Sequence, residues 1–173
     1  MLQLRVATPV AMRKEDPLWR MSFCRSLSDH LSCAQAALEI LALLRKTGDS
    51  EVWKGIELQI AEDRAELERL MSSTGSASST LRHAAAWTSE KLAELKLRVD
   101  DPSGTGHLRR LELIEALAIG IDGKQALWRA LQATAGSTAS LRSLDYPRLI
   151  ARAEAQRRIV ESERLAAAAD ALR

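Results

Sequence analysis

The chain has 173 residues, of which 46% are hydrophobic and 28% charged, a composition typical of a folded protein rather than a disordered one. Its 25 basic and 23 acidic side chains leave a formal charge of only +2, and no basic cluster indicates nucleic-acid binding. Two cysteines are too few for a disulfide scaffold, and no unbroken apolar run is long enough to predict a membrane span. We therefore expect a cytoplasmic protein that binds neither nucleic acid nor membrane.

Aromatic residues make up only 3% of the chain, which is rich instead in Ala, Leu, Glu and Arg and is therefore predicted to be all-α. Residues 1–25 have no sustained hydrophobic period and are predicted to form a loosely ordered N-terminal tail, ordered in part by Trp19 or Phe23. Met21 is an alternative to Met1 as the start of translation. Residues 26–173 are predicted to form a single helical-bundle domain.

The first helix is predicted to begin at Ser26 or Ser28, both good N-cap residues, and to end before Gly48. Leucine and alanine recur there at steps of three and four, the pattern of one buried helix face. The second helix is predicted to follow Ser50 and to end before the polar loop at 72–76. That loop is short, so consecutive helices should run antiparallel.

The third helix is predicted over about 79–99, before a stretch rich in Asp, Pro and Gly. The fourth, over about 106–133, is apolar around most of its circumference, Ile119 included, and is predicted to be the most buried. Gly120 and Gly123 lie inside it. They are interpreted as close-packing points or a kink, because glycine weakens a helix by about 1 kcal/mol relative to alanine.

A fifth helix is predicted to follow Asp145, with Pro147 in its first turn, and to carry a thin, alanine-rich apolar stripe. Trp53 and Trp87 are interpreted as packing at the edge of the core, and Trp128 as an anchor for the last turns of the fourth helix. The predicted fold is an antiparallel four-helix-type bundle with an additional C-terminal fifth helix.

Several polar residues interrupt the apolar faces. At about 100° per residue, Asp63 falls in the middle of the stripe of the second helix, and His30 lies within that of the first. Lys91 lies at the edge of the third stripe, and Glu115 on one side of the fourth helix. These four residues form the predicted internal polar cluster. A buried carboxylate needs a cation or several donors, and the expected partners are Lys91, Arg64, His30 and Arg129.

Two interpretations of this cluster remain open. A satisfied network that fixes the register of the helices needs no ligand. A metal site would use Asp63-x-x-Glu66 and Glu112-x-x-Glu115, or His30 with Asp63 and Glu115, but the Glu-x-x-His pairs of a di-metal bundle are missing. No nucleophile elbow or phosphate-binding loop is present in the sequence, so no catalytic or cofactor-binding residue is predicted.

Four segments carry a resemblance to known proteins: Asp29-His30-Leu31, Glu62-Asp63-Arg64, Glu90-Lys91-Leu92, and the stretch LELIEALAIGIDGKQALW at 111–128. With these segments the chain resembles an uncharacterised family of small bacterial helical proteins, over about Leu27 to Leu165. The resemblance implies a helical fold and no particular activity. The architecture is also similar to that of ferritin-like bundles.

Two functions follow from this sequence. The first is a non-enzymatic interaction or structural module that forms a homo-oligomer or binds a protein partner through a helix face. The alternative is a ferritin-like bundle that binds a metal or small ligand through His30, Asp63 and Glu115, with Lys91 nearby.

Overall fold

The computed structural model describes residues 17–46, 50–73, 106–137 and 140–173, and all of the regular structure in these ranges is helical. The prediction of an all-α protein is confirmed for this part of the chain. The long helices are α1 (Pro17–Leu44), α2 (Ser50–Ser73), α4 (His107–Thr134) and α5 (Tyr146–Ala171). Short 3-10 turns at Ala135–Ser137 and Leu141–Ser143 join α4 to α5. The predicted helix over 79–99 lies outside the described residues.

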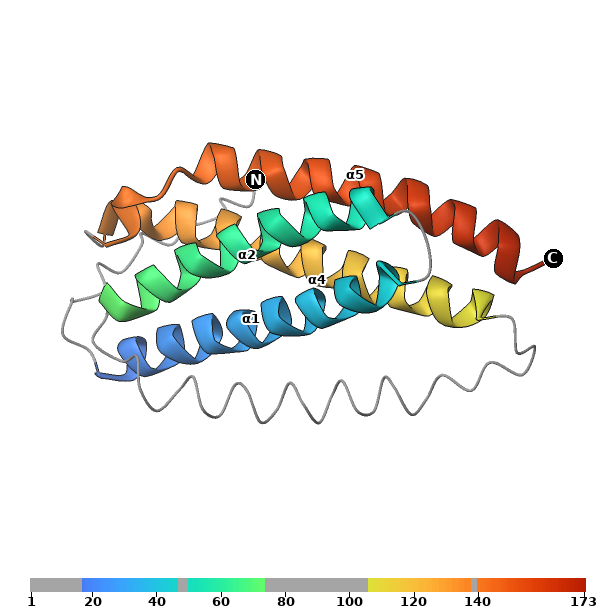
Figure 1. Ribbon diagram of the computed structural model, residues 1–173. Helices are drawn as coiled ribbons and strands as arrows, with labels where there is room; N and C mark the ends of the chain where they lie inside the picture. The colour runs from blue at the N-terminus through green and yellow to red at the C-terminus, as the bar shows by residue number, and fades with distance from the viewer. Residues whose placement is uncertain (1–16, 47–49, 74–105, 138–139) are drawn as a thin grey trace, which may run out of the picture.

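The four long helices lie along one another (Figure 1). α4 packs against α5 over much of its length, and α1 packs against both α2 and α4. α2 and α5 approach each other less closely, and long polar side chains span the seam between them. The helices therefore enclose an interior that is apolar on most sides and polar along the α2–α5 seam.

The positions at which α4 and α5 begin have clear local causes. Gly106 precedes α4 with a φ of 77°, a left-handed conformation that glycine adopts without steric cost. At the start of α5, the Asp145 side chain accepts a hydrogen bond from the Arg148 backbone N–H at 3.1 Å, and Pro147 stands in the first turn. The predicted starts of α2, α4 and α5 agree with the structure.

The predicted start of α1 is wrong, because the helix begins at Pro17 and not at Ser26 or Ser28. Proline fits the first turn of a helix, where its missing N–H would have no intrahelical acceptor. Cys24 is buried, and Phe23 packs against the core. Part of the predicted loose tail is therefore helical and packed.

The apolar core consists of two clusters. The first apolar cluster joins all four long helices and includes Ile40, Leu41, Leu44, Trp53, Ile56, Ile60, Ile114, Leu117, Ile121, Ala153 and Val160. The second apolar cluster lies nearer the starts of α1 and α5 and nearer the ends of α2 and α4 than the first. It includes Leu27, Leu31, Leu67, Leu70, Met71, Leu127, Trp128, Leu141, Tyr146 and Leu149. Burial of these side chains is the main source of stability for helices of this kind.

Three expectations about individual residues need correction. Trp53 is fully buried in the first apolar cluster and does not lie at its edge. Ile119 is 73% exposed, so α4 has a solvent-facing side and is not apolar all round. A Cβ atom at Gly120 or Gly123 would meet nothing within 4 Å, so neither glycine is required by close packing. Trp128 is fully buried, as predicted for an anchor of the last turns of α4.

Within the described part of the chain, one helical stretch, Met21–Leu44, is long and apolar enough to cross a membrane by length and composition. Half of its window is buried against the other helices, and a core helix can meet the same criterion. This stretch is therefore weak evidence for a membrane span.

Candidate functional site

The two apolar clusters are separated by polar side chains. Asp63 of α2 lies between Ile60 of the first apolar cluster and Leu67 of the second. Lys124 of α4 likewise follows Ile121 and precedes Leu127, and α5 contributes Arg152 and Gln156. We call Asp63, Lys124, Arg152 and Gln156 the polar layer.

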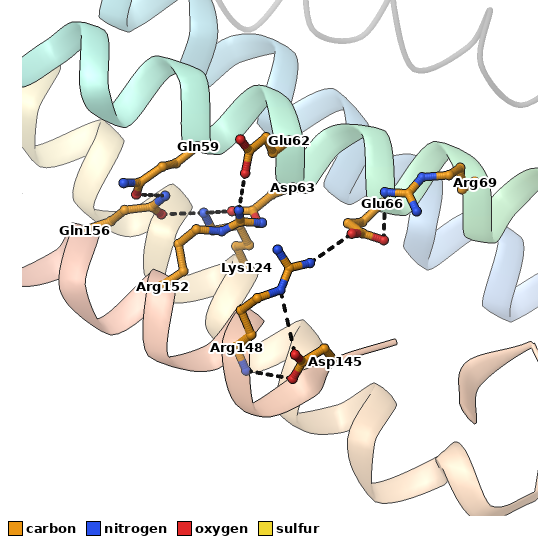
Figure 2. A network of polar contacts seen from close by, with 10 residues as sticks. All are labelled: Gln59, Glu62, Asp63, Glu66, Arg69, Lys124, Asp145, Arg148, Arg152 and Gln156. Carbon is orange, nitrogen blue, oxygen red and sulfur yellow. Dashed lines mark hydrogen bonds and ion pairs between the residues drawn. The ribbon is translucent and has the colours of Figure 1, made fainter. Parts of the chain in front are cut away.

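Asp63 is the centre of the polar layer (Figure 2). Its side chain is 1% exposed, and its two carboxylate oxygens are bound by cations from two different helices. Lys124 Nζ donates to Asp63 Oδ2 at 2.5 Å, and Arg152 Nη2 donates to Asp63 Oδ1. A buried carboxylate without such partners would strongly destabilise the fold, so this pairing is what makes Asp63 tolerable at the position.

Gln156 and a row of surface pairs extend the network along the α2–α5 seam. Gln156 is fully buried, accepts a hydrogen bond from Lys124 Nζ at 2.5 Å, and donates to Gln59 Oε1 at 3.0 Å. Arg152 Nη1 also donates to Glu62 Oε2 at 2.5 Å. Further along the seam, Arg148 of α5 donates to Glu66 Oε1 of α2 at 3.2 Å. The network thus links α2 to both α4 and α5.

Burial changes the acidity of Lys124. The loss of water around its ammonium group lowers the pKa of Lys124 below 10.5, whereas the nearby Asp63 carboxylate acts in the opposite direction. Arg152 adds a second positive charge on the same carboxylate and also lowers the pKa of Lys124. The polar layer therefore places two nearly buried cations on one buried carboxylate, and Arg152 also pairs with Glu62 at the surface.

The structure brings together only part of the predicted polar cluster. His30 is half-buried on α1, where its Nδ1 lies 2.9 Å from the Ser26 carbonyl oxygen, and it lines the same cleft as Asp63. Glu115 is instead 46% exposed and pairs with Arg164 at 3.5 Å, because the side of α4 that carries it faces the polar edge of α5. Lys91 lies outside the described residues.

The two cations that pair with Asp63 were not among its expected partners. Arg64 binds Gln35 and Glu68, and Arg129 lies at the surface with Glu154. Lys124 could have been found from the sequence, because it continues the three-and-four spacing of Leu117, Ile121 and Trp128. Arg152 gives a weaker signal, since arginine beside an apolar stripe usually extends to the solvent.

A cleft reaches the polar layer between α1, α2 and α4. Its α1 side is formed by His30, Cys33, Ala34 and Ala37, and its α4 side by Gly120, Ile121 and Lys124. Asp63 lies in it with Arg64 and two apolar neighbours on α2, and the space inside it that water molecules can occupy is only about 30 Å³. Small side chains on α1 and the missing side chain at Gly120 leave this space.

The chemistry available in the cleft is limited. Among the residues that the structure describes, no group of three His, Cys, Asp or Glu side chains could hold a metal ion. Cys33 lines the cleft and is exposed as a residue, but its thiol is partly covered by neighbouring atoms. This partial loss of water raises the pKa of the Cys33 thiol, and the carboxylate of Asp29 raises it further. A raised pKa disfavours the nucleophilic thiolate. The lining of the cleft is therefore largely apolar, with Asp63 and Lys124 as its polar members next to Arg64 and His30.

No protein-family model, no curated protein and no solved structure matches this chain. The resemblance to small bacterial helical proteins therefore stays a prediction. Function is inferred from the polar layer, the cleft and the helix surfaces of this chain alone.

Proposed function

We propose that this chain is a non-enzymatic interaction module of the cytoplasm that self-associates through the outward face of α5. The supporting observation is a stripe of mostly exposed residues on that helix and the residue after it, all of them small or apolar except one arginine. The positions repeat every seven residues with alternating steps of four and three, as in the seam of a coiled coil. We call this stripe the α5 seam; it consists of Ala151, Ala155, Arg158, Ser162, Leu165, Ala169 and Leu172.

The exposure of the α5 seam favours a protein partner over a role in the core. Leu165 is 56% exposed and Leu172 is 75% exposed, whereas the buried stripe of the same helix contains Leu149, Ala153, Val160 and Ala167. α5 thus has two apolar stripes, and among the described residues only the first of them, with Leu149 and Val160, packs against other helices. A second copy would cover the outer one with an identical surface, as in a two-fold dimer.

The chemistry of the α5 seam also favours a second copy of the chain. Arg158 is its only charged member, so no strongly acidic or basic partner is indicated. The alanines and Ser162 are small enough for two helices to approach closely. Other charged residues of α5 lie beside the seam, where Arg157 pairs with Asp122 and Glu161 pairs with Arg164. This arrangement resembles an apolar seam with a polar rim.

The polar layer supports a structural rather than a catalytic role. Both oxygens of Asp63 are bound by protein cations, and Gln156 links the same cluster to Gln59. A network of this kind can specify the register of packed helices. We further propose that the whole chain is an antiparallel bundle of five helices, in which the apolar face predicted over 79–99 packs on the described helices.

Self-association can be tested by sedimentation equilibrium of the full chain and of a variant with Leu165→Glu. We expect a dimer for the natural chain and a monomer for Leu165→Glu, because the substitution replaces an exposed apolar side chain of the seam with a charge. Leu58→Glu is the matched control, since Leu58 is 62% exposed on α2, away from the α5 seam. A natural chain that stays monomeric, or equal effects of the two substitutions, would contradict the proposal.

Binding of a small ligand between the helices is the second candidate function. The cleft at the polar layer favours it, and the described residues favour a small molecule over a metal ion.

A further inference from the structure

We propose that the outward face of α4 joins the α5 seam in one two-fold interface, so that a second copy of this chain covers both helices. This inference rests on the proposed self-association. It adds to it a second helix, the orientation of the second copy and the charged contacts between the copies. We call the new surface the α4 stripe; it consists of Ala116, Ile119, Gly123, Ala126, Ala130 and Ala133.

The α4 stripe faces solvent in the described part of the chain. Ile119 is 73% exposed, and every other member except the half-buried Ala116 is also exposed. The positions follow alternating steps of three and four, the same spacing as in the α5 seam and in the seam of a coiled coil. Most of the exposed large hydrophobic side chains in the described ranges belong to these two helices or to the residue after α5, namely Ile119, Ile159, Leu165 and Leu172.

The α5 seam alone is too small for a stable interface. Such an interface takes roughly 20–30 residues from each side. The α5 seam supplies seven residues, and three of these are alanines. Because α4 packs against α5 over much of its length, a second copy seated on the α5 seam also reaches the α4 stripe. The two stripes and the side chains between them approach the size that a stable interface needs.

A row of partly exposed ion pairs joins the two helices beside these stripes. The row consists of Glu115–Arg164 at 3.5 Å, Asp122–Arg157 at 3.1 Å and Arg129–Glu154 at 3.1 Å. Its α4 members are spaced by seven residues and each directly precedes a member of the α4 stripe. Residues that flank an apolar seam in this way form ion pairs between the helices of a coiled coil and set their orientation.

The order of charges on α4 favours a second copy in antiparallel orientation. Glu115 lies seven residues before Asp122, and Arg129 lies seven residues after it. An antiparallel contact between two α4 helices centred near Asp122 therefore places Glu115 of each copy beside Arg129 of the other. A parallel contact in register would place like charges beside each other, which is unfavourable. This self-complementary pattern is what a two-fold interface requires.

The test is sedimentation equilibrium of the full chain with a glutamate in either stripe. We expect Ile119→Glu to weaken the dimer by at least about tenfold, as for Leu165→Glu, and the control Leu58→Glu to leave it within about twofold. Circular dichroism establishes that the variants are folded, and all three positions are exposed.

The pattern of effects separates this inference from the proposed function. A dimer that is lost with Leu165→Glu but unchanged in Ile119→Glu would overturn the role of the α4 stripe and leave the α5 seam intact. An effect of Ile119→Glu without one of Leu165→Glu would instead contradict the proposed α5 seam. A natural chain that stays monomeric would overturn both.

Charge reversal tests the orientation. Glu115→Arg and Arg129→Glu should each weaken the dimer by about two- to fivefold, and the double variant should associate within about twofold of the natural chain. The double variant places like charges beside Arg164 and Glu154 of its own chain, so a recovery can come only from contacts between copies. A double variant that associates more weakly than either single variant would overturn the antiparallel orientation.

Discussion

The carboxylate of Asp63 and the ammonium group of Lys124 meet at 2.5 Å inside the protein, between two apolar clusters. Asp63 belongs to α2 and Lys124 to α4, and Arg152 of α5 binds the other oxygen of Asp63. Three helices are thus fixed to one another at a single carboxylate. A shift of any of them along its axis would leave a buried charge without its partner, so the polar layer opposes such shifts more strongly than apolar contacts would.

Asp63→Ala is expected to destabilise the chain by roughly 3–5 kcal/mol, because it leaves Lys124 and Arg152 without their shared counter-ion. The free energy of unfolding in urea measures this change. Asp122→Ala is a suitable control, since Asp122 is 56% exposed and pairs with Arg157 at the surface. That control should lose less than about 1 kcal/mol. Similar losses at the two positions would mean that the pairing of Asp63 contributes little.

The triple variant Asp63→Leu, Lys124→Met and Arg152→Met tests whether the loss comes from orphaned charges. Replacement of a whole buried ion network by apolar side chains is often neutral or stabilising. We therefore expect the triple variant to be more stable than Asp63→Ala alone, despite its larger number of substitutions. A triple variant that is less stable than the single one would indicate that the polar contacts themselves stabilise the fold.

Much of the fold could be predicted from the sequence, because helix boundaries are encoded locally. Asp145 and Pro147 mark the start of α5, and Gly106 marks that of α4. The exception is α1, whose first turns contain good internal cap candidates at Ser26 and Ser28. Packing of Phe23 and Cys24 extends the helix past both of them, and such tertiary contacts are not visible in a local pattern.

The candidate site could be predicted only in part. The period of α2 identified Asp63 as internal, because a single helix fixes which residues share a face. Its partners depend on how helices distant in the sequence are aligned, and Lys124 and Arg152 lie far from Asp63 along the chain. Glu115 shares an α4 side with apolar residues in the sequence pattern. It is nevertheless solvated, since its neighbour on α5 is Arg164.

Tyr146 is the only tyrosine in the chain, so its ionisation can be followed directly by ultraviolet absorbance. Its hydroxyl is buried and donates to the Leu141 carbonyl oxygen at 2.8 Å, and burial raises the pKa of Tyr146 above 10.0. We expect a titration midpoint above 10 in the folded chain and a midpoint near 10 in denaturant. Coincident midpoints would show that the hydroxyl is solvated in the folded chain.

The raised pKa of Tyr146 also predicts how stability depends on pH. The folded state holds the proton more tightly than the unfolded state, so this contribution is complete below pH 10 and is lost as the pH rises through the folded pKa. Tyr146→Phe should remove this part of the alkaline loss of stability. At neutral pH the same variant should lose about 0.5–1.5 kcal/mol with the hydrogen bond. An unchanged alkaline slope in Tyr146→Phe would contradict this assignment.

Alanine substitution should change the stability of the chain in opposite directions at Gly123, inside α4, and at Gly106, which precedes it. Gly123 is exposed inside the helix, and a Cβ atom there meets nothing, so Gly123→Ala should stabilise the chain by about 0.5–1 kcal/mol through helix propensity. Gly106 precedes the helix with a φ of 77°, where a Cβ atom is strained, so Gly106→Ala should destabilise it by about 1 kcal/mol or more. Thermal unfolding of the two variants measures both changes. If Gly123→Ala is less stable than the natural chain, helix propensity does not decide the effect of this substitution and the prediction is wrong.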